Sequence, residues 1–85
     1  MKKQKLPKWF TGLLYAEGLI VENPFSGEEY ELTNVELSMY DFIIGSQRVF
    51  EVAPKTVTTK QVNDFHKALT WFRKNNSEAY MVLLD

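Results

Sequence analysis

The sequence predicts a small α+β domain in which an antiparallel β-sheet of three to four strands packs against two α-helices. Three observations predict it: an alternating polar and apolar stretch on either side of a turn at residues 24–27, and two helix-start signals, at Thr33 and at Thr58. Of the 85 residues, 45% are apolar and 25% are charged, which are ordinary proportions for a folded domain. No linker or low-complexity stretch interrupts the chain. Residues 1–85 are therefore expected to form a single domain.

The N-terminal residues 1–8 are expected to be a mobile basic arm. They contain four lysines and little apolar surface, and Pro7 disfavours helix in the residue before it. Ordered structure is expected from about Trp9. Residues 9–15, WFTGLLY, are rich in aromatic side chains and contain Gly12, which favours a kinked strand over a helix, and residues 16–18 are expected to turn.

The clearest β-signal is a hairpin around residues 24–27. With the turn placed there, Leu19 pairs with Leu32 and Glu22 pairs with Glu29, and the two faces of the hairpin separate by polarity. One face carries Leu19, Val21, Tyr30 and Leu32, and the other carries Ile20, Glu22, Glu29 and Glu31. In the turn, Pro24 fixes a suitable φ and Gly27 supplies a positive φ. This stretch is therefore explained by local structure alone.

A first helix is predicted to begin at Asn34. Thr33 and Glu36 have the spacing of a capping box, in which each side chain accepts a hydrogen bond from the other residue's backbone amide. Gly45 is predicted to end this helix. Residues 48–52, RVFEV, are then expected to form a further strand.

A second helix is predicted over residues 59–75. Thr58 and Gln61 form another capping box, and apolar residues recur at helical spacing after it. The remaining C-terminal residues are compatible with a short helix capped by Ser77 or with a final strand, and we favour the short helix.

The composition argues against catalysis and against a membrane location. Net charge is −1, no cysteine is present, and no apolar run approaches the ~20 residues of a membrane span. His66 has no nucleophile and carboxylate arranged around it, and no phosphate-binding loop occurs. The acidic hairpin face lacks the converging Asp, His or carbonyl ligands of a metal site. We therefore expect a non-enzymatic cytoplasmic protein without a cofactor, metal or small-molecule ligand.

The first predicted helix is a candidate protein interface. Its apolar side chains cover most of its circumference, so it either occupies the centre of the fold or presents a patch to another chain. In the second case, the simplest arrangement is a homodimer built on Met39, Phe42 and Ile43.

Trp71 is the second candidate contact residue, because helical spacing sets it apart from the apolar face of its helix and among Lys60, Lys67 and Lys74. One interpretation is that the C-terminal tail or a partner protein covers it. The alternative is a weak single-stranded nucleic-acid site, in which the indole stacks on a base while the three lysines and the basic arm contact phosphates.

The strongest resemblance to known proteins rests on ENPFSGEEYELTNVELSMYDFIIGSQ and ALTWFRKNNSEAYMVLLD. These stretches are similar to small, uncharacterised proteins of tailed bacteriophages, especially those that infect marine bacteria. The resemblance covers residues 15–85. It implies a phage accessory protein that acts in the host cytoplasm, and it transfers no catalytic or binding residue. The leading hypothesis is a protein that works by protein contact, as a homo-oligomer or by binding a host factor.

Overall fold

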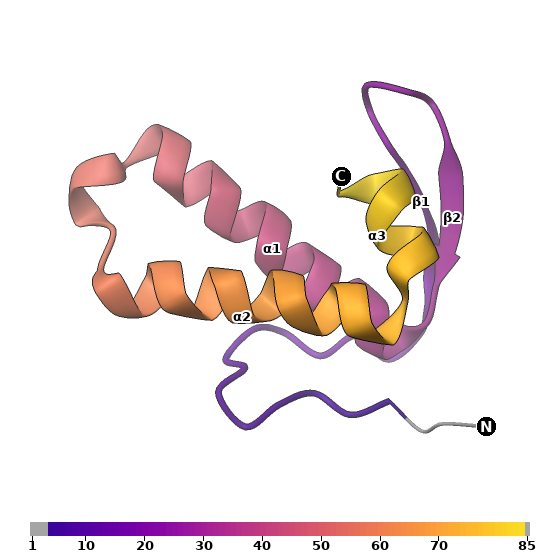
Figure 1. The fold of residues 1–85 in the computed structure, drawn as a ribbon, viewed down its shortest axis with the longest axis horizontal. Helices are drawn as coiled ribbons and strands as arrows, with labels where there is room; N and C mark the ends of the chain where they lie inside the picture. The colour runs from indigo at the N-terminus through magenta and orange to yellow at the C-terminus, as the bar shows by residue number, and fades with distance from the viewer. Residues whose placement is uncertain (1–3, 85) are drawn as a thin grey trace.

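The computed structural model describes residues 4–84, which form an α+β fold with three α-helices and one two-stranded antiparallel sheet. The elements follow in the order β1 (Leu19–Glu22), β2 (Glu29–Leu32), α1 (Asn34–Val52), the 3₁₀ turn η1 (Pro54–Thr56), α2 (Thr59–Asn75) and α3 (Ser77–Leu83). Figure 1 shows α1 and α2 joined through η1 into a helical hairpin, while the β-hairpin and α3 lie together at its other end. The N-terminal segment runs along α2 before it enters β1 (Figure 1).

The predicted β-hairpin and its register are confirmed. Leu19 pairs with Leu32 and Glu22 pairs with Glu29. The Asn23 side chain closes the turn by accepting a hydrogen bond from the backbone amide of Phe25 at 2.8 Å. Gly27 has a φ of 79°, the left-handed conformation that the turn requires.

The sheet has two strands in residues 4–84, and the further strands predicted at residues 9–15 and 48–52 are absent from it. The first of these segments lies on α1, where the rings of Trp9 and Phe10 pack on Phe42 with centroids 5.9 and 5.5 Å away. The backbone amide of Tyr15 donates to Ser38 Oγ at 2.9 Å. Aromatic packing on a helix and a side-chain hydrogen bond therefore replace strand pairing here.

Helix α1 begins with the predicted capping box, but the prediction that it ends at Gly45 is wrong. The helix continues to Val52 and stops at Ala53, directly before Pro54. Residues 48–52 are its last turns, because the ring of Phe50 packs edge-on against Phe65 of α2 at a centroid distance of 5.2 Å. This contact holds the end of α1 beside α2, so a glycine alone does not terminate the helix.

The second helix has the predicted bounds, and its capping box of Thr58 and Gln61 is confirmed. The favoured short C-terminal helix is also confirmed as α3. Its N-cap is Asn76 and not Ser77, because Asn76 Oδ1 accepts the amide hydrogen of Ala79 at 3.1 Å.

The hydrophobic core lies where α1, α2, α3 and β2 meet. Its buried apolar residues are Leu32, Leu37, Met39, Ile43, Ala68, Phe72, Ala79 and Leu83. A half-buried layer that includes Leu6, Trp9 and Phe10 of the N-terminal segment packs against this core. Of the predicted mobile arm, residues 1–3 lie outside the described residues, and the part from Gln4 onward lies against the fold.

Candidate interaction surfaces

The structure places the predicted interface of the first helix mostly inside the fold. Met39 and Ile43 are both 0% exposed and belong to the core, so neither is available to a second chain. Phe42 is half-buried, because Trp9 and Phe10 cover it. The N-terminal segment thus occupies the apolar surface of α1 that the sequence left without a partner.

Trp71 lies in a shallow hollow of about 420 Å³ on the outer side of α2. The hollow is lined by Trp9, His66, Lys67, Thr70, Trp71 and Lys74, and we call this set the tryptophan surface. The indole Nε1 of Trp71 donates a hydrogen bond to the backbone carbonyl of Lys5 at 3.2 Å, which ties the N-terminal segment to the helix. Trp71, Lys67 and Lys74 are therefore brought together as the sequence predicted.

Lys60 does not belong to the tryptophan surface. Its Nζ lies 2.7 Å from the Asp64 carboxylate one helical turn along α2, and it lines a different cleft, between α1 and α2. Trp9 and His66, in contrast, were not predicted at this surface. Helical spacing could have placed His66 beside Thr70, but nothing local to Trp9 indicates which helix it packs against.

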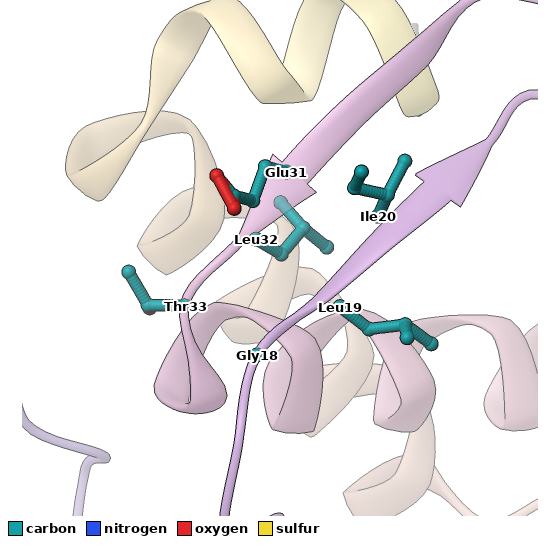
Figure 2. Close-up of a pocket in the computed structure, with 6 residues that line it drawn as sticks. All are labelled: Gly18, Leu19, Ile20, Glu31, Leu32 and Thr33. Atoms are coloured by element: carbon teal, nitrogen blue, oxygen red, sulfur yellow. The ribbon is translucent and has the colours of Figure 1, made fainter.

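A second candidate surface is the outer edge of β1, shown in Figure 2. Leu19 and Ile20 are 60% and 59% exposed, and they line a shallow hollow of about 610 Å³ together with Gly18 and the end of β2. Leu19 extends to the outer side of β1, away from β2 (Figure 2). We call residues 18–22 the β1 edge.

The hydrogen-bond pattern shows which backbone groups of the β1 edge point outward. The Asn23 amide donates to the Glu28 carbonyl at 2.8 Å, so this pair is a hydrogen-bonded one. Because bonded and non-bonded pairs alternate in an antiparallel ladder, Ile20 and Glu22 direct their amide and carbonyl groups away from β2. Among the hydrogen bonds of residues 4–84, none is made by these outward groups to another part of the chain. The β1 edge is therefore an open edge.

Acidic side chains of the hairpin do not assemble a metal site. Glu22, Glu29 and Glu31 are all exposed, and the described part of the chain contains no group of three residues that could hold a metal ion. The α1–α2 cleft, of about 370 Å³, contains two carboxylates, Asp41 and Asp64. Asp64 is paired with Lys60, which compensates its charge.

Tyr15 is coupled electrostatically to Asp41. Loss of solvation and then the nearby Asp41 carboxylate raise the pKa of the Tyr15 phenol. This favours the neutral phenol, whereas a general base would need the opposite shift. The pair therefore does not point to catalysis.

Glu36 is 4% exposed and lies at the centre of a buried polar cluster that we call the polar junction. Its Oε2 accepts hydrogen bonds from Gln4 Nε2 at 2.7 Å and from Asn76 Nδ2 at 3.0 Å, and its Oε1 accepts from the Thr33 amide at 2.9 Å. Asn76 Oδ1 in turn accepts from the Tyr30 hydroxyl at 3.3 Å. Two of these contacts join Glu36 to distant segments and the third caps α1, so the polar junction is structural.

Comparison with protein-family models, with curated proteins and with solved structures gave no match for this chain. Within residues 4–84, no helix combines the length and the apolar character needed to cross a membrane. The tryptophan surface and the β1 edge are therefore the two candidate sites of function within residues 4–84.

Proposed function

We propose that this chain is a non-enzymatic protein that acts through protein contact, and that a second copy of the chain pairs with it along the β1 edge. The observation that supports this proposal is the open edge itself, with its outward amide and carbonyl groups and the exposed Leu19 and Ile20. Open strand edges readily pair with another strand, and pairing here would extend a sheet that has only two strands within residues 4–84.

The sequence of β1 suits pairing with itself. In an antiparallel, two-fold symmetric arrangement centred on Ile20, the outward groups of Ile20 bond to the same groups of the second copy. Leu19 then lies opposite the second copy's Val21, and Glu22 lies opposite its Gly18. Like charges are kept from facing each other, and the exposed apolar side chains gain cross-strand neighbours. The product is a sheet of four strands, two from each copy.

As part of the same proposal, the resemblance to small phage proteins implies an accessory role in the cytoplasm of an infected bacterium. The self-contact requires no cofactor, metal or small-molecule ligand. A host protein that adds a strand to the same edge is the competing partner, and the oligomeric state of the isolated chain distinguishes the two.

The mass of the wild-type chain across a dilution series tests the proposal. Light scattering is expected to show a dimer that dissociates on dilution, and Ile20→Lys is expected to be monomeric because edge lysines block strand pairing. Met81→Lys is the matched control, since Met81 is 66% exposed but lies on α3. A wild-type chain that stays monomeric at its highest soluble concentration refutes self-pairing.

A cysteine variant tests the register. The chain contains no cysteine, so Ile20→Cys introduces a single thiol. Residues facing each other in a hydrogen-bonded antiparallel pair have Cα atoms about 5.5 Å apart, a separation that a disulfide spans. Ile20→Cys is expected to form a covalent dimer on mild oxidation, and Met81→Cys is expected to remain largely uncrosslinked. Equal crosslinking of both variants would contradict the proposed register.

A further inference from the structure

We infer that the tryptophan surface binds single-stranded nucleic acid, with bases stacked on Trp9 and Trp71 and phosphates held by the lysines around them. This inference does not depend on the proposed dimer, because the tryptophan surface and the β1 edge have no residue in common.

The tryptophan surface brings together aromatic and cationic side chains from two distant segments. Trp9 comes from the N-terminal segment and Trp71 from α2, and Lys67 and Lys74 lie on either side of Trp71. Lys5 and Lys8, both exposed, belong to the segment that the Trp71–Lys5 hydrogen bond holds against α2. The surface therefore presents cations both on the helix and on the adjoining segment.

Within residues 4–84, no acidic side chain lines this hollow. The acidic residues of β2, Glu29 and Glu31, belong to the hairpin, which extends away from α2 beside α3 (Figure 1). The net charge of −1 therefore conceals a local positive surface, and an anionic ligand is electrostatically favoured there.

Both indoles are supported from within the fold. Trp9 packs on Phe42, and the Nε1 donor of Trp71 is already bonded to the Lys5 carbonyl. Held rings lose little conformational freedom when a ligand stacks on them, which favours binding. Because the indole N–H of Trp71 is occupied, its contribution to a ligand is the apolar ring and not a hydrogen bond.

These features favour a single nucleic-acid strand over the other anionic polymers. An acidic peptide would neutralise the lysines but offers no flat rings for two tryptophans, whereas unpaired bases do. In a duplex the base faces are stacked on one another and only the base edges reach the grooves. Stacking on aromatic rings tolerates any base, so no strong sequence preference is expected.

Binding should depend on salt to a moderate degree. For single strands, the slope of log affinity against log salt concentration is about −0.7 per neutralised phosphate. Two to four lysine contacts therefore predict that affinity rises roughly 7- to 50-fold when salt is lowered from about 0.2 to about 0.05 M. A larger gain would require cations beyond Lys5, Lys8, Lys67 and Lys74, the lysines of this surface and its adjoining segment within residues 4–84.

The test is a titration of the full chain with a twelve-residue oligothymidine, followed by tryptophan fluorescence and repeated with a duplex and with polyglutamate. Wild type is expected to bind the single strand best. Trp71→Ala is expected to weaken binding about 5- to 150-fold, the effect of losing one stacked base, while Trp71→Phe retains most of it.

A matched pair of charge variants separates a site from general attraction. Lys67→Gln with Lys74→Gln removes two charges from the tryptophan surface, and Arg48→Gln with Lys55→Gln removes two exposed charges elsewhere. Only the first pair should weaken binding and flatten the salt dependence, with circular dichroism confirming that each variant is folded. No wild-type binding at low salt, equal losses in both pairs, or equally tight binding of polyglutamate would each overturn the inference.

Discussion

Replacing Glu36 by glutamine removes the charge from the polar junction while leaving its shape. The remaining amide oxygen can still accept from the Thr33 amide, so the capping box survives. The new amide group, however, faces two donors, Gln4 Nε2 and Asn76 Nδ2. Asn76 cannot rotate to offer its oxygen, because that oxygen accepts from the Ala79 amide and from Tyr30.

The expected cost follows from these two bonds. Losing the hydrogen bond from the constrained Asn76 to a buried charge should cost about 1.5–3 kcal/mol, and losing the bond from the half-exposed Gln4, which can turn to water, should cost about 0.5–1 kcal/mol. Glu36→Gln should therefore lower the free energy of unfolding by about 2–4 kcal/mol. For a domain of this size, a loss of about 3 kcal/mol lowers Tm by roughly 12–24 °C.

Urea unfolding followed by circular dichroism measures this cost. Glu31→Gln is the matched control, because Glu31 is exposed on the hairpin, and its effect should stay within about 0.5 kcal/mol. Gln4→Ala removes the bond to Glu36 and the bond that Thr33 Oγ1 donates to Gln4 Oε1 at 2.8 Å, so it should cost about 1–2 kcal/mol alone. The cost should be smaller in the Glu36→Gln background, because Gln4 and Glu36 share a hydrogen bond. A loss below about 1 kcal/mol for Glu36→Gln would refute the structural role given to the polar junction.

Two further predictions concern glycines and a tyrosine. Gly45→Ala should raise the free energy of unfolding by about 0.5–1 kcal/mol, since a Cβ there meets no atom within 4 Å. Gly18→Ala should lower it by about 1–3 kcal/mol, because the added Cβ collides with the Leu32 carbonyl oxygen. A thermal unfolding experiment in which both variants shift Tm in the same direction would contradict this. Burial raises the pKa of the Tyr40 phenol in the folded chain, so on raising the pH the unfolded chain loses this proton before the folded chain does. The free energy of unfolding should therefore be unchanged below about pH 10 and should fall as the pH rises towards the folded pKa. Urea titrations between pH 8 and 11 should show a smaller fall for Tyr40→Phe, and an equal fall would be evidence against this cause.

The elements that local sequence could predict are those whose signals lie within a few residues. The hairpin register follows from side-chain alternation and from a turn that needs a positive φ at Gly27. Both long helices start at threonine caps, where two side chains satisfy two backbone amides across three residues. Neither the hairpin register nor the two helix starts requires a contact with a distant part of the chain.

The predictions that failed involve contacts between distant residues. Residues 9–15 have the composition of a strand, but burial of Trp9 and Phe10 on Phe42 determines their conformation. Similarly, α1 continues beyond Gly45 because the packing of Phe50 on Phe65 outweighs the low helix propensity of one glycine. Tertiary packing thus places the N-terminal segment on the helices and not in the sheet, and the same contacts place Trp9 beside Trp71.

The two proposals together predict that dimerisation strengthens binding to long strands. A dimer carries two tryptophan surfaces, so a strand that reaches both binds the second one at a raised effective concentration. Where the strand spans both surfaces, its overall affinity should rise by about 100-fold or more. Ile20→Lys should then bind a short oligothymidine as wild type does but lose the advantage on a long one. Since the added lysine could only increase attraction to phosphates, weaker binding cannot arise from its charge. If the ratio of long-strand to short-strand affinity is the same in both proteins, the two surfaces do not act together.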